Sequence, residues 1–265
     1  MAGRAKTRRL FPFVSSEIPD FELDRVLQFG TLPPVYLSKY PADELRSYAG
    51  DYLQEEIRAE ALSRNIEGFS RFLRRAALSS GEVLNFESVA SDAQLSARTI
   101  REYFFVLEDT LVGTMLQPFA TKHRKAISKG KFYFFDVGVL NSLIGQTLAP
   151  DTKAYGDAFE HFIFQELYAY LSYRKAHEEL HFWRSTTHQE VDFVIQGEIA
   201  VEVKSSKNVS PSDFKGLRAL TEDTKMRRQI IVCREPEKRK IGDVEIYPYR
   251  QFLNEVWAGD LSVAV

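Results

Sequence analysis

The sequence lacks the features that mark secreted and membrane proteins. Its 265 residues include a single cysteine, Cys233, so no internal disulfide can form. The apolar run QIIVC around it predicts a buried thiol that serves as a small hydrophobic group. No apolar run is long enough to cross a bilayer, and the basic start MAGRAKTRR is followed by a stretch too short and polar for a signal peptide. We therefore expect a cytoplasmic protein with no membrane partner.

An excess of charge of one sign is also lacking. The 35 basic and 37 acidic side chains give a net charge of -2, which excludes a globally basic nucleic-acid binder. Local basic patches remain, because residues 1–9 and 121–131 are rich in Lys and Arg and contain no acid. A solvated loop and a nucleic-acid contact both fit such a run, so its position in the fold must decide.

The length and composition predict a globular chain with two domains. Apolar residues make up 44% and charged residues 27%, and 265 residues can form two separate cores. The patterns predict helices over about 41–78, a helix and hairpin unit over 83–143, and alternating helices and strands over 155–249. We expect an α+β or α/β fold with a connector over 1–40, a helical and winged-helix domain over 41–145, a linker within 144–157, and an α/β domain with a mixed sheet over 150–265.

A helix-turn-helix pattern lies within residues 83–109. Ser96 is predicted to cap the second helix, which would bury Ile100 and neighbouring apolar residues at helical spacing. Arg98 and Arg101 would then face solvent as in a recognition helix, although Glu102 beside them opposes phosphate. The pattern predicts contact with DNA or with a protein, and leaves both open.

The segment after these helices predicts the wing of a winged helix. Two apolar stretches, LVGTMLQPF and KFYFFD, flank the basic run 121–131 and would form a hairpin with that run at its tip. Lys122, Arg124 and Lys125 at the tip could lie along a phosphate backbone. Winged helices also serve as protein-interaction modules, so the alternative of protein docking stays open here too.

Two further patterns lack the context that their chemistry needs. HEELH at 177–181 resembles a zinc-protease motif, but it leads into a predicted strand and has no evident third ligand downstream. FYFFD, ending at Asp136, resembles the strand that carries a magnesium ligand in ATPases. The chain has no G-x-x-x-x-G-K-S/T loop, so an autonomous ATP site is not expected.

The stretch EVDFVIQGEIAVEVKSS, residues 190–206, is a predicted hairpin that contains acids among its apolar residues. Alternate strand residues share a face, so Glu202 and Lys204 point the same way. A three-residue turn at 196–198 places Asp192 opposite Glu202, whereas a two-residue turn pairs Asp192 with Val203. The register therefore decides whether the two acids meet.

A third acid could reach the same surface. Glu160 lies on the apolar stripe of a helix predicted to begin near Ala154. Converging carboxylates repel each other unless a divalent cation lies between them, which predicts a Mg²⁺ site at Asp192 and Glu202, supported by Glu160. With Lys204 beside it to assist water and stabilise charge, the group suits phosphodiester hydrolysis. The alternative is a solvated strand end with a Glu and Lys pair.

These residues resemble a known superfamily. Asp192, then VEVK with Glu202 and Lys204, preceded by Glu160 on a helix, is similar to the PD-(D/E)xK nucleases. The runs AYGDAFEHFIFQEL, HFWRSTTHQEVDFVI and IAVEVKSS resemble the C-terminal domain of unknown function of bacterial and archaeal predicted AAA-type ATPases. In those proteins a winged helix precedes the nuclease-like fold. AGRAKTRRLFPF resembles the last strand and sensor-arginine region of such an ATPase, with Arg4 in the matching place.

The resemblance implies two functions of different classes. One is a nucleic-acid-associated module, DNA being favoured, with a Mg²⁺-dependent nuclease site. The other is a non-catalytic scaffold for DNA or protein, with an ATPase domain or a second copy of the chain as partner. Residues 1–40 would be the residual end of an ATPase domain, and ATP hydrolysis is not expected of this chain alone because it lacks the nucleotide-binding loop.

Overall fold

The computed structural model describes residues 9–52, 66–121, 129–175 and 179–260. Helices dominate its first part, as the apolar periodicity predicts. Their bounds are α1 Leu23–Phe29, α2 Pro33–Tyr36, α3 Pro41–Ser47 with a π-helical turn Tyr48–Tyr52, α5 Ile66–Leu78, α6 Phe86–Ala93 and α7 Ala97–Asp109.

The predicted helix-turn-helix elements are present. Gln94, at the end of α6, adopts the left-handed conformation with φ 56°, which turns the chain between the helices. Ser96 then caps α7, since its Oγ accepts a hydrogen bond of 3.1 Å from the backbone N–H of Thr99. Ile100 and Leu107 of α7 are fully buried against α5 and α6, so this helix presents its apolar side inward as expected.

A hairpin follows the helices and joins them to the sheet. Strand β1, Gly113–Pro118, pairs antiparallel with β2, Lys131–Phe134. The end of β1 pairs in parallel with β3, Leu180–Arg184, where Gln117 lies opposite His181. The predicted wing is therefore continuous with the sheet of the C-terminal part. The last histidine of HEELH, His181, lies in β3, which confirms the expectation of a strand at this position.

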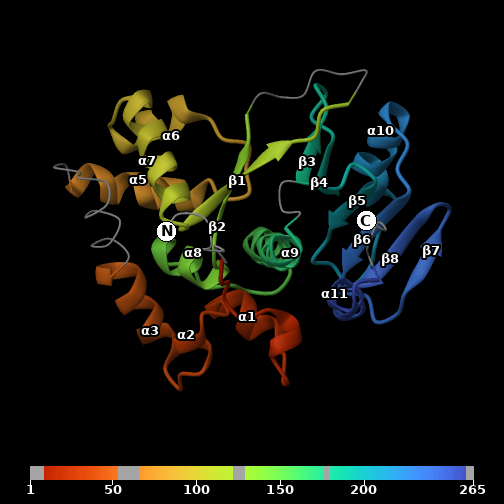
Figure 1. Ribbon diagram of the computed structural model, residues 1–265, viewed down its shortest axis with the longest axis horizontal. Helices are drawn as coiled ribbons and strands as arrows, with labels where there is room; N and C mark the ends of the chain where they lie inside the picture. Colours follow the sequence, from red (N-terminus) through yellow and green to blue (C-terminus); the bar gives the residue numbers. More distant parts are fainter. Residues whose placement is uncertain (1–8, 53–65, 122–128, 176–178, 261–265) are drawn as a thin grey trace, which may run out of the picture.

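The C-terminal part of the described chain adds further strands and helices, with consecutive strands before α10 and again before α11 (Figure 1). The strands are β4 Glu190–Ile195, β5 Ile199–Val203, β6 Arg228–Cys233, β7 Arg239–Ile241 and β8 Val244–Pro248. The helices are α8 Val137–Ile144, α9 Lys153–Tyr173, α10 Lys215–Asp223 and α11 Tyr249–Ala258. The eight-stranded sheet is mixed, in the order β2-β1-β3-β4-β5-β6-β8-β7, so the chain has a mixed α/β fold.

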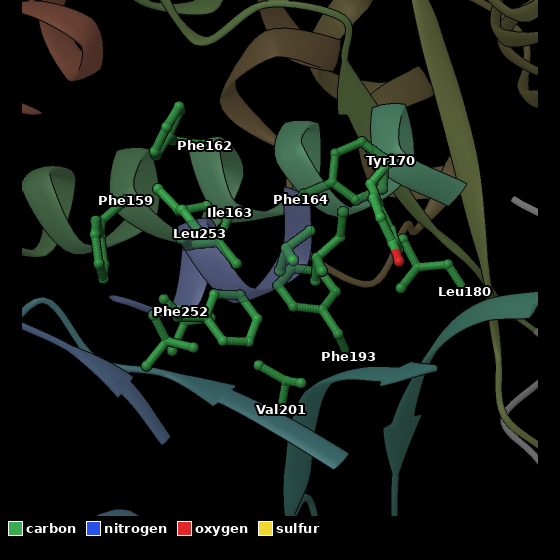
Figure 2. Packing of buried hydrophobic residues seen from close by; sticks show 14 of the residues in the cluster. Phe159, Phe162, Ile163, Phe164, Tyr170, Leu180, Phe193, Val201, Phe252 and Leu253 are labelled. Atoms are coloured by element: carbon green, nitrogen blue, oxygen red, sulfur yellow. The ribbon is translucent and has the colours of Figure 1, made fainter. Parts of the chain in front are cut away.

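Helix α9 packs on one face of the sheet and forms the centre of the main core. Phe159 and Ile163 point from α9 toward the sheet, where Phe193 of β4 and Val201 of β5 meet them, and Phe252 of α11 closes the cluster (Figure 2). All five side chains are buried. Full burial of such a side chain contributes roughly 1.5 to 3 kcal/mol, so this cluster holds α9 in a fixed position above the strands.

Helix α10 covers the opposite face. Leu217 and Leu220 of α10 pack against Val194 of β4 and Ile231 of β6. Cys233 belongs to the same cluster and is completely buried, as its apolar surroundings in the sequence predict. Burial raises the pKa of its thiol to about 11, so the side chain serves as a neutral apolar group.

Asp136, the acid of FYFFD, has a structural role. Its buried carboxylate accepts hydrogen bonds from the backbone N–H groups of Thr31 (2.8 Å) and Val139 (3.0 Å), which caps α8. Gly30 and Gly138 allow this close approach, since a Cβ at Gly30 would overlap the carboxylate of Asp136 and one at Gly138 would overlap the backbone of Phe29. None of the helices within the described residues is long and apolar enough to cross a membrane.

Candidate functional site

The turn of the β4–β5 hairpin has three residues, as one of the two sequence alternatives predicts. Ile195 pairs with Ile199 and Phe193 pairs with Val201, with Gly197 at φ 68° in the turn. Continuing this register by one residue places Asp192 opposite Glu202. The pairing of β4 with β3 shifts register between Val191 and Val194, so β4 is irregular at Asp192. Asp192 and Glu202 are nevertheless close, because each lies within reach of Lys204 and the charge of Glu202 acts on Asp192.

Asp192 is 7% exposed and held in place by the neighbouring strand. Its Oδ2 accepts a hydrogen bond of 2.7 Å from the backbone N–H of Val203. Burial raises the pKa of Asp192 well above its ordinary value, and the negative charges of Glu202 and Glu160 raise it further. Lys204 and Lys131 act in the opposite direction and offset part of this rise in pKa.

Glu202 is the second carboxylate beside Asp192, and only one of its two oxygens accepts a hydrogen bond from the described residues. Its Oε1 accepts a hydrogen bond of 2.5 Å from Nζ of Lys204. Its Oε2 is buried with no hydrogen-bond partner among the residues that the structure describes. Burial raises the pKa of Glu202, and the nearby ammonium of Lys204 only partly offsets this. A buried oxygen of this kind costs free energy unless a ligand or ion satisfies it.

Gly216 of α10 makes room for this oxygen. A Cβ at this position would lie 1.8 Å from the carbonyl oxygen of Glu190 and 3.5 Å from Oε2 of Glu202. Any larger residue would push α10 away from the site, so the glycine allows the helix to cover both acids closely.

Lys204 stays charged in this position. Burial opposes the charge, but Asp192 and Glu202 together raise the pKa of the ammonium above the usual lysine value. The side chain remains 32% exposed, so its charge can reach a ligand. Its contact with Glu202 shows that the Glu and Lys pair of the sequence is formed, at a site where both carboxylates are buried.

Glu160 lies in the same electrostatic cluster but has partners that the sequence did not reveal. The hydroxyl of Tyr133 donates a hydrogen bond of 2.6 Å to Oε1 of Glu160, and Nζ of Lys131 donates another of 3.3 Å to the same oxygen. Burial alone would raise the pKa of Glu160, but the charge of Lys131 and the two hydrogen bonds lower it. Glu160 is therefore held as a carboxylate.

Lys131 is the main functional residue that the sequence analysis missed. It was counted with the basic run 121–131, yet it is 2% exposed and begins the fully buried strand β2. Its Nζ lies 2.5 Å from Oε1 of Glu190, as well as 3.3 Å from Glu160. Burial opposes its charge, but the surrounding acids raise the pKa of Lys131 well above the usual value. A lysine inside an otherwise apolar strand was the signal, because such a charge must have a buried partner.

Glu190 completes the cluster from the start of β4. Arg184, at the end of β3, forms a second ion pair with it at 3.2 Å. The cluster thus contains four carboxylates, Glu160, Glu190, Asp192 and Glu202, and three cations, Lys131, Arg184 and Lys204. If all are charged, 4 minus 3 leaves one net negative charge, which adds to the effect of burial in raising the pKa of Asp192.

The donor set suits a hydrated magnesium ion better than a fully protein-coordinated metal. Across residues 9–52, 66–121, 129–175 and 179–260, no group of three or more His, Cys, Asp or Glu side chains is arranged to hold a metal. Mg²⁺ needs only one or two carboxylates, because it keeps several water ligands. Asp192 and Glu202 supply two carboxylates for such an ion. Oε2 of Glu202 has no hydrogen-bond partner among the described residues, so it is available as a ligand.

The two predicted nucleic-acid contacts on α7 are engaged with acids. Arg98 forms an ion pair of 3.0 Å with Glu102, and Arg101 forms one of 3.1 Å with Glu87. Both arginines are exposed, but their charges are balanced locally. Two other sets of predicted residues lie outside the described part of the chain. They are the wing-tip residues Lys122, Arg124 and Lys125, and Arg4 of the sensor-arginine region.

Comparison with known families divides the chain into two matched regions. Residues 155–252 match a family described as Domain of unknown function (DUF4143), and residues 20–150 match one described as Domain of unknown function (DUF8612). Lys131 and Tyr133 belong to the DUF8612 region, whereas Asp192 and Glu202 belong to the DUF4143 region, so the cluster is shared. No curated protein and no solved structure matches the chain.

Proposed function

We propose that the chain is a nucleic-acid-associated module of an AAA-type ATPase and that its DUF4143 domain hydrolyses phosphodiesters with Mg²⁺. The observation that supports the proposal is the close approach of two buried carboxylates, Asp192 and Glu202, beside Lys204 at the end of the β4–β5 hairpin. The ATPase context rests on the resemblance of the sequence. It is supported by the DUF4143 match, because this domain often lies C-terminal to AAA-type ATPases.

The roles of the side chains follow from their charges and partners. Asp192 and Glu202 would hold the ion, and Oε2 of Glu202 would gain the partner that it lacks. Glu160, held as a carboxylate, contributes negative charge that favours a cation nearby. When bound, Mg²⁺ supplies positive charge against the charge that develops on the phosphate and makes water more acidic.

Lys204 would act as a fixed positive charge. Its raised pKa keeps it protonated at neutral pH, so it cannot serve as a general base without losing the stabilisation that Asp192 and Glu202 provide. An ammonium with a partly exposed side chain can instead orient water and stabilise negative charge on the phosphate.

A second candidate function is a non-catalytic scaffold that binds a protein. The favouring observation is the outer face of α7, where Arg98 and Arg101 are paired with acids of the same domain. Phe105 on this helix is 68% exposed. An exposed aromatic residue among balanced charges fits a protein partner better than a phosphate backbone, which needs unbalanced positive charge.

Cleavage by the purified chain distinguishes the two functions. Labelled DNA and RNA, single- and double-stranded, would be incubated with Mg²⁺ or with EDTA. We expect Mg²⁺-dependent cleavage that disappears in Asp192→Asn and in Glu202→Gln and is unchanged in Glu237→Gln, an exposed glutamate outside the cluster. A wild-type chain that cleaves none of these substrates would support the scaffold. Cleavage that persists in both carboxylate variants would place the chemistry elsewhere.

A further inference from the structure

Lys131 occupies the position between two carboxylates where a cation would neutralise both. Its Nζ lies 2.5 Å from Oε1 of Glu190 and 3.3 Å from Oε1 of Glu160. Glu160 comes from α9 and Glu190 from β4, so the two acids converge on one point from different elements. Acids that converge in this way normally require a bound cation.

The ammonium of Lys131 is held firmly in this position. Strand β2 fixes its backbone, since Lys131 pairs with Leu116 of β1 and forms a bridge with Val83 on its other side. The side chain is 2% exposed, and its Nζ lies 5.5 Å from the ring centre of Phe182. Lys131 therefore cannot leave the cluster without a movement of the hairpin.

Both acids that contact Lys131 have further donors from the protein. Oε1 of Glu160 also accepts the hydrogen bond from Tyr133, and Glu190 also pairs with Arg184. Oε2 of Glu202 differs from these, because it is buried without a hydrogen-bond partner in the described part of the chain. The cluster thus divides into a half in which Lys131 and Arg184 balance two acids, and a half in which Lys204 is the single cation beside Asp192 and Glu202.

We infer that Lys131 replaces a second divalent cation, so that the site binds a single metal ion, at Asp192 and Glu202. This inference rests on the proposed function for the location of that ion. It makes Lys131 a positioning residue, which never touches the substrate but sets the number of metal ions. Because Lys131 belongs to the DUF8612 region, that region completes the site of the DUF4143 domain.

Removing the ammonium should create a second metal site. In Lys131→Met, Glu160 and Glu190, whose side chains are 23% and 26% exposed, would be two partly buried carboxylates without the cation that they share. A divalent ion bound by oxygen ligands can take that place. Calorimetric titration with Mn²⁺, which accepts the same oxygen ligands as Mg²⁺, should give one ion per wild-type chain and two per Lys131→Met chain.

Three control variants separate charge from general damage to the fold. Lys131→Arg keeps the positive charge and should bind one ion. Lys131→Met combined with Glu190→Gln removes one of the two carboxylates and should also return to one ion. Lys153→Met removes an exposed lysine of α9 that pairs with Asp157, and should bind one ion with unchanged affinity.

A second readout covers the case in which Lys131→Met folds poorly. Metal that binds only the folded state raises the melting temperature, and two ions raise it more than one. Mn²⁺ should therefore raise the melting temperature of Lys131→Met more than that of the wild type. The wild type alone also tests the inference, because it should bind no second ion even at millimolar Mn²⁺.

The outcomes distinguish this inference from the function on which it rests. Two ions per wild-type chain, or one ion per folded Lys131→Met chain with an equal rise in melting temperature, would overturn the role of Lys131 and leave the Asp192 and Glu202 site intact. A wild-type chain that binds no Mn²⁺ would overturn both.

Discussion

Asp192 accepts a hydrogen bond of 2.7 Å from the backbone N–H of Val203, the residue after Glu202, so the two acids meet in a buried cluster with Lys204. A turn one residue shorter would place the two acids on opposite faces of the sheet. The three-residue turn thus brings two acids together where the sheet would otherwise exclude them. The cost of their burial appears in the raised pKa of both carboxyl groups.

Replacing Lys131 by methionine should strongly destabilise the fold in the absence of metal. The variant leaves Glu160 and Glu190 without the ammonium that they share, and breaking a buried ion pair in this way costs about 3 to 5 kcal/mol. Urea unfolding in EDTA measures the difference. Lys153→Met, whose side chain is 78% exposed, should change stability by less than about 0.5 kcal/mol. An equal loss of unfolding free energy in the two variants would show that the buried contacts of Lys131 do not stabilise the fold.

Gly216→Ala should also destabilise the protein. The added Cβ would lie 1.8 Å from the carbonyl oxygen of Glu190, so α10 or β4 must shift. Overpacking of this kind costs roughly 1 to 3 kcal/mol, which urea unfolding can resolve. Gly50→Ala is the matched control, because nothing lies within 4 Å of its Cβ position. A loss of stability in Gly50→Ala as large as that in Gly216→Ala would remove the steric explanation.

The local parts of this site could be predicted from the sequence, and the non-local parts could not. Turn length and alternation limit residues 190–206 to two registers, and helical spacing puts Glu160 on the apolar stripe of its helix, because both depend on neighbours in the chain. The role of Lys131 depends on β1 pairing with β3, which brings the hairpin to the sheet. No local pattern encodes that pairing, so Lys131 was grouped with the basic residues that precede it.

Stability should fall as pH rises from about 4.5 to 7 because of Glu166. Burial raises the pKa of this carboxyl to about 7, from an ordinary value of 4.5, although Trp257 and Ser15 donate hydrogen bonds to it. The folded state therefore binds more protons than the unfolded state in this range, and folding loses free energy as pH rises. The change is about 1.4 kcal/mol per pH unit, or about 3 kcal/mol in total.

Glu166→Gln isolates this contribution. Asp192 and Glu202 also have raised pKa values and keep their own pH dependence in the variant. We expect the unfolding free energy of the variant to fall less between pH 4.5 and 7 than that of the wild type. Parallel profiles of the two proteins would show that Glu166 does not titrate in this range.

DNA binding by the predicted wing can be tested without knowing the cleavage activity. If Lys122, Arg124 and Lys125 contact phosphates, replacing all three by alanine should flatten the plot of log affinity against log salt by about 0.9 per lost contact on duplex DNA. Filter binding at several salt concentrations measures the slope. An unchanged slope would leave protein docking as the function of this surface. Arg98→Ala and Arg101→Ala should have smaller effects, because these arginines already pair with acids.

The most direct test of the account is the position of a bound metal. Crystals of the chain soaked in Mn²⁺ would show the ion by its anomalous scattering. We expect one site, with carboxylate oxygens of Asp192 and Glu202 at about 2.1 to 2.3 Å, and no ion between Glu160 and Glu190. An ion bound elsewhere, or no ion at millimolar Mn²⁺, would contradict the assignment of Asp192 and Glu202 as a metal site.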